Sequence, residues 1–151
     1  MFLQFLLLAV FGVAMAHVEG VVVVYLRKAI GMPEKNTEVG NKELLEKVPR
    51  RYIRIEMTRE AATIVMLLAL AYLVGQSWLD RIVVFLWTFA FWDLFYYVSL
   101  YVVIKWPPRL TTTDVLFLIP RPWIAPVWFP VGVSSLTIVL IAVFYVLPGM
   151  L

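Results

Sequence analysis

Residues 82–104, IVVFLWTFAFWDLFYYVSLYVVI, contain a single charged residue, Asp93. An apolar segment of this length exceeds the roughly 20 residues that a helix needs to cross the hydrocarbon core of a bilayer. The chain as a whole is 63% hydrophobic and 15% charged, with a mean hydropathy of +0.90. These values exclude an ordinary soluble domain. The sequence therefore predicts an integral membrane protein.

Three further apolar blocks accompany this segment. A chain of 151 residues has room for about four spans and no second large domain. We expect an all-α integral membrane protein, a four-transmembrane-helix bundle that forms one transmembrane domain over residues 1–151. The predicted spans are residues 2–26, 56–75, 81–104 and 131–148.

Two connections between the spans are long. Residues 27–55 are polar and form a predicted loop. Residues 105–130 are apolar but contain six prolines, which rule out a continuous helix. Here we expect a short helix after Thr111, capped by Thr113 or Asp114, and then an irregular segment that is partly re-entrant or interfacial.

The basic residues predict the orientation, because cytoplasmic loops carry the excess of Lys and Arg. Nine of the 13 basic residues lie between Arg27 and Arg59, three lie within residues 105–130, and only Arg81 lies in the turn between the second and third spans. We therefore place both long connections in the cytoplasm and both termini on the non-cytoplasmic side. The net charge of +3 reflects this orientation and indicates no nucleic-acid partner.

The first apolar block resembles a signal peptide, because small residues at Ala14 and Ala16 could form a cleavage site. However, the block lacks a basic segment at its start, and its apolar residues continue to Val24. We expect a retained transmembrane helix.

Five ionisable residues lie in or beside the predicted spans: His17, Glu19, Glu60, Asp93 and Asp114. At 1.5 Å per helical residue, the first four lie roughly 20 to 25 Å from the outer ends of their helices. Asp114 could reach the same layer if the proline-rich segment folds inward. Ionisable groups inside a membrane are costly and usually mark a functional site.

Helical periodicity refines this layer. Glu56, Glu60 and Thr63 share one face of the second span, and Asp93, Tyr96 and Tyr97 share one face of the third. We expect both faces to point into the bundle. His17 and Glu19 are about 200° apart on an ideal helix. Both can enter one small site only if the helix is locally distorted.

One interpretation of the layer is a metal site, because an imidazole and several carboxylates suit iron, manganese or zinc. His17, Glu60 and Asp93 would be the primary ligands, with Glu19 and Asp114 as additional ligands. A redox or hydrolytic enzyme acting on a hydrophobic substrate would follow most naturally. The sequence has no Glu-x-x-His motif, so the pattern departs from that of the ferritin-like centres. Residues expected beside the metal are Tyr96, Tyr97 and Arg59.

Three other interpretations remain open. An oligomeric proton-coupled carrier or a small-molecule-binding protein could use Glu60 and Asp93 to carry a proton or to balance a cationic substrate. A carboxylate or His17 could act on a lipid-like substrate without metal. The layer could also consist of structural ion pairs made by Arg27, Arg59 and Arg121, in which case there is no site. Glu56 is expected to be solvated, and the expected partners are membrane lipids, an amphiphilic small molecule and a second copy of the chain.

Overall fold

The structure is a computed structural model and describes residues 1–31 and 48–148. Within these residues, four helices are long and apolar enough to cross a membrane. This confirms a helical, multi-pass membrane protein. The predicted loop 27–55 lies partly outside the described residues. The helices are α1 (Phe2–Ala29), α3 (Arg50–Val74), α4 (Trp78–Ile104) and α5 (Trp128–Ile141), and α5 continues into a π-helical segment, η1 (Ala142–Val146).

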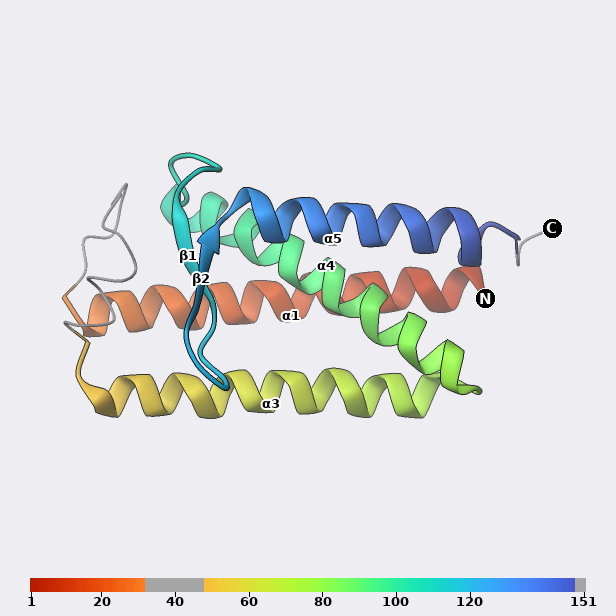
Figure 1. The fold of residues 1–151 in the computed structure, drawn as a ribbon, viewed down its shortest axis with the longest axis horizontal. Coiled ribbons are helices and arrows are strands. Elements are labelled where there is room, and N and C mark those ends of the chain that lie inside the picture. The colour runs from red at the N-terminus through yellow and green to blue at the C-terminus, as the bar shows by residue number, and fades with distance from the viewer. Residues whose placement is uncertain (32–47, 149–151) are drawn as a thin grey trace.

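Helix α4 is the centre of the arrangement. Helices α1, α3 and α5 run along the long axis of the molecule, whereas α4 crosses them obliquely and packs against all three (Figure 1). The start of α1 and the end of η1 lie at the same end of the bundle, where the rings of Phe5 and Tyr145 are 5.8 Å apart. An even number of passes is expected to produce this placement.

Small residues bring α1 and α4 close together. Gly12, Ala16 and Gly20 recur at every fourth position of α1 and are buried. A Cβ atom added at Gly12 would lie 2.9 Å from Cβ of Phe91, and one at Gly20 would lie 2.8 Å from Oγ of Ser99. Close approach through small residues is a common way for membrane helices to pack.

The outward faces of the four helices are apolar. Leu73 is 78% exposed and Val102 is 65% exposed. An apolar surface of this extent needs an apolar environment. The outer surface therefore agrees with the hydropathy of the spans.

The proline-rich segment differs from the prediction. The expected short helix after Thr111 is wrong, because the segment forms strands β1 (Thr113–Phe117) and β2 (Trp123–Pro126), which pair as an antiparallel hairpin. Thr113 and Asp114 therefore cap no helix. Prolines in the turn and at the end of β2 cannot donate helical hydrogen bonds, whereas the side chains of β1 suit a strand. The chain is consequently not purely α-helical.

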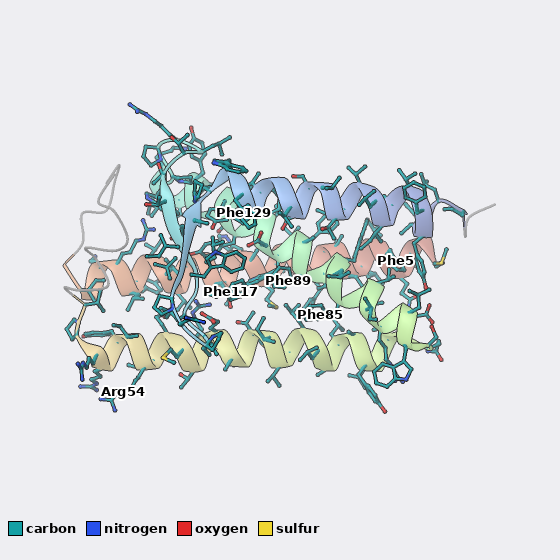
Figure 2. The ribbon with its side chains drawn as sticks, viewed as in Figure 1. Phe5, Arg54, Phe85, Phe89, Phe117 and Phe129 are labelled. Carbon is teal, nitrogen blue, oxygen red and sulfur yellow. The ribbon has the colours of Figure 1, made fainter. Side chains whose placement is uncertain are left out.

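The hairpin crosses the long axis of the bundle and reaches from α5 toward α3 (Figure 1). The ring of Phe117 on β1 stacks near that of Phe89 on α4, with centroids 6.2 Å apart. Figure 2 shows both residues near the middle of the molecule. The hairpin thus covers the space between α3 and α4.

Candidate functional site

A pocket lies between α1, α3, α4 and β1. It is open at its mouth and has a cavity volume of about 160 Å³. Four of the five predicted metal ligands line the pocket, namely Glu19, Glu60, Asp93 and Asp114.

An ion-pair network of Glu19, Glu56 and Arg59 forms one wall. Nη1 of Arg59 lies 2.7 Å from Oε1 of Glu19, and its Nε lies 2.9 Å from Oε2 of Glu56. Thr63 donates a hydrogen bond to Oε1 of Glu19, and Nε1 of Trp92 donates to Oε2 at 3.0 Å. Because buried carboxylates are costly unless they are paired, these contacts compensate the charge of Glu19.

Glu60 binds the tip of the hairpin. Its Oε2 accepts a hydrogen bond from the backbone N–H of Leu118 at 2.8 Å, and its Oε1 accepts one from Ile119 at 3.0 Å. Only 8% of Glu60 is exposed. The residue therefore anchors the hairpin to α3.

Asp114 joins β1 to α4. The hydroxyl of Tyr97 donates to Oδ2 of Asp114 at 3.1 Å, and the backbone N–H of Val115 donates to its Oδ1 at 2.9 Å. Both Asp114 and Tyr97 are buried. Asp114 thus has a structural role in positioning the hairpin.

Asp93 has a different environment. The hydroxyl of Ser134 on α5 donates to its Oδ2 at 2.7 Å. Among residues 1–31 and 48–148, Asp93 has no other hydrogen-bond partner and no ion-pair partner. The Asp93 side chain is only partly buried and lines the pocket.

His17 lies outside the pocket. It is exposed on α1, and its Nδ1 lies 2.9 Å from Oγ of Ser99 on α4. Glu19 is buried and turned toward α3. Consequently, His17 and Glu19 do not share a site.

The predicted metal ligands do not form one ligand set. In the part of the chain that the structure describes, no three His, Asp or Glu residues gather closely enough to hold a metal ion. His17 does not line the pocket, while Glu60 and Asp114 accept hydrogen bonds from the protein. The geometry therefore gives no support to the metal interpretation.

Of the residues expected beside the metal, Tyr96 lines the pocket, with its ring 5.2 Å from that of Tyr97. Arg59 pairs with carboxylates, in line with the ion-pair interpretation. Arg27 instead lies over the ring of Trp106, 4.1 Å from its centroid.

Several residues at the site are not apparent from the sequence. The prediction that Glu56 is solvated is wrong, because this residue is only 8% exposed. Its position four residues before Glu60 places both on one helix face, which could have indicated its burial. No local signal identifies Ser134 as the partner of Asp93, nor the hairpin amides as the partners of Glu60.

The comparisons with known proteins add no family to these observations. No protein-family model matches the chain, and no curated protein or solved structure matches it either.

Proposed function

We propose that this membrane protein binds an amphiphilic small molecule in the pocket between α1, α3, α4 and β1. The observation that carries the proposal is the division of the pocket lining into a polar and an apolar part. Glu19, Arg59 and Asp93 contribute to the polar part, whereas Leu26 and Ile53 contribute to the apolar part.

Leu26 and Ile53 lie at a different level along the helices from Glu19 and Glu60, and Arg27 lines the pocket beside Leu26. Leu26 follows Glu19 by seven residues on α1, and Ile53 precedes Glu60 by seven residues on α3. At 1.5 Å per residue, the apolar part lies about 10 Å from the polar part. A molecule with a polar head and an apolar body fits this order.

We place the apolar part of the pocket toward the cytoplasmic face. Exposed basic residues at the start of α3, including Arg50 and Arg54, support this orientation (Figure 2). The hairpin then enters the membrane from the cytoplasmic side, both termini lie on the non-cytoplasmic side, and residues 1–151 form one transmembrane domain. Irregular backbone at membrane depth is tolerated where it is buried in protein.

The proposal requires no second copy of the chain, because elements of one chain line the pocket. It also requires no metal. It retains the small-molecule-binding interpretation of the sequence and assigns most of the buried carboxylates to structural roles.

A pair of tryptophan substitutions tests the proposal. Leu26→Trp enlarges a side chain that lines the pocket, whereas Val22→Trp adds the same group at a position that is 38% exposed and outside the pocket lining. Both variants are reconstituted in phosphatidylcholine nanodiscs with dodecanol that carries a photoreactive group. We expect saturable labelling to fall in Leu26→Trp and to persist in Val22→Trp. Equal labelling of both variants would contradict the proposal.

A further inference from the structure

The charge compensation inside the pocket is uneven. The two glutamates of the ion-pair network share Arg59 as their cation. Glu60 accepts hydrogen bonds from two backbone N–H groups, and Asp114 accepts hydrogen bonds from a tyrosine hydroxyl and a backbone N–H. The only partner of Asp93 among the described residues is the neutral hydroxyl of Ser134. Asp93 is therefore the pocket carboxylate that the described residues compensate least.

A bound cation would compensate Asp93. An ionised carboxylate between membrane helices is costly without a partner, and such residues commonly act as counter-ions for ligands. Asp93 lines the same pocket as the apolar part described above. A charged head at Asp93 therefore leaves the rest of the ligand within reach of Leu26 and Ile53.

Aromatic rings also favour a cation. Trp92, Tyr96 and Phe117 line the pocket together with Asp93. The faces of aromatic rings attract ammonium groups, most strongly where water is excluded. A site with one carboxylate and several rings therefore suits an amine or a quaternary ammonium group.

An anionic head is a poor match. Arg59 and Arg27 both line the pocket, but the guanidinium of Arg59 is already paired with Glu19 and Glu56, and that of Arg27 lies over the ring of Trp106 at the level of Leu26, away from Asp93. An additional negative charge near Asp93 would be repelled, because like charges in a partly buried site disfavour each other. A neutral head would leave Asp93 without a charged partner.

We infer that the ligand is a cationic amphiphile, whose amine or quaternary ammonium head pairs with Asp93 while its apolar body occupies the pocket between α1 and α3. This inference rests on the proposed function and adds the chemical class of the ligand.

Two photoreactive probes with the same dodecyl chain test the inference. One carries a trimethylammonium head, which is charged at every pH, and the other carries a hydroxyl. The protein is held in phosphatidylcholine nanodiscs, so that no anionic lipid concentrates the cation. We expect the cationic probe to bind about tenfold more tightly, because its charge is attracted to Asp93 and to the aromatic rings although it donates no hydrogen bond.

Three variants locate the source of this preference. Asp93→Asn removes the charge and should abolish the preference for the cation. Asp80→Asn removes an equal charge at the exposed start of α4 and should leave the preference unchanged. Ser134→Ala removes the hydroxyl but keeps the carboxylate, so the preference should persist there too. A purely structural role for Asp93 predicts the same loss in Ser134→Ala as in Asp93→Asn.

The outcomes separate the inference from the proposed function. Equal affinities of the two probes in the wild-type protein, with labelling that Leu26→Trp reduces, would overturn the cationic ligand and retain the pocket. Labelling that Leu26→Trp does not reduce would overturn both. Because the comparison of head groups uses the wild-type protein, it decides the inference even if Asp93→Asn does not fold.

Discussion

The contact of Glu60 with the hairpin gives a sharp prediction for Glu60→Gln. The carboxylate accepts one backbone N–H on each oxygen, from Leu118 at 2.8 Å and from Ile119 at 3.0 Å. Glutamine has nearly the same shape but only one acceptor oxygen. Its amide nitrogen would face a second N–H donor, which leaves one of the two backbone groups without an acceptor.

The size of the effect follows from these two bonds. A hydrogen bond to a charged group contributes about 1.5 to 3 kcal/mol, and a neutral one contributes about 1 kcal/mol. The wild-type protein has two of the first kind, whereas the variant keeps one of the second kind. We expect the free energy of unfolding to fall by roughly 2 to 5 kcal/mol.

The assay combines unfolding in mixed micelles with hydrogen exchange of the Leu118 and Ile119 amides. In Glu60→Gln, both amides should exchange faster than in the wild-type protein. Glu56→Gln is the matched control, because Glu56 contacts Arg59 and not the hairpin. Unchanged exchange at both amides in Glu60→Gln would refute the assignment of Glu60 as the anchor.

Further predictions concern packing, the ion-pair network and His17. Gly12→Ala should destabilise the protein by about 1 to 3 kcal/mol through overpacking. Gly132→Ala is the control and should be neutral or slightly stabilising, because the added Cβ meets nothing within 4 Å. Equal effects of the two substitutions in SDS unfolding would contradict the close packing of α1 on α4. Glu19→Gln should cost about 1 to 3 kcal/mol in the same assay, because it removes the negative charge paired with Arg59, and an unchanged unfolding curve would contradict the network. His17→Ala should lower the free energy of unfolding by about 1 kcal/mol. The variant should match the wild-type protein in probe labelling and in zinc, iron and manganese content. Loss of a stoichiometric metal would revive the metal interpretation.

The helices were predictable because hydropathy is a local property. Each of the four predicted spans overlaps one of the four long helices. Their ends were less predictable. Helix α3 begins at Arg50, several residues before the apolar part, because charged side chains are tolerated where a helix leaves the membrane.

The hairpin was not predictable from residues 105–130 alone. Its prolines exclude a helix but do not specify strands. The contacts of the hairpin are distant in sequence, since Glu60 holds Leu118 and Phe89 packs on Phe117. Such pairings depend on the tertiary arrangement, which outweighs local preference.

The depth of the ionisable residues anticipated part of the pocket. Glu19, Glu60 and Asp93 come from three different helices and line the same space. Depth alone, however, could not show how each carboxylate is compensated. The partner of Asp93, Ser134, lies 41 residues away on another helix.

The most direct test of the account is to map where the photoreactive dodecyl probes attach, by mass spectrometry of the digested protein from nanodiscs. We predict saturable adducts within residues 92–97 and 114–118. An excess of the same dodecyl compound without the photoreactive group should remove these adducts. Adducts that do not saturate and that lie on outward residues such as Leu136, which is 59% exposed, would contradict the existence of a ligand pocket.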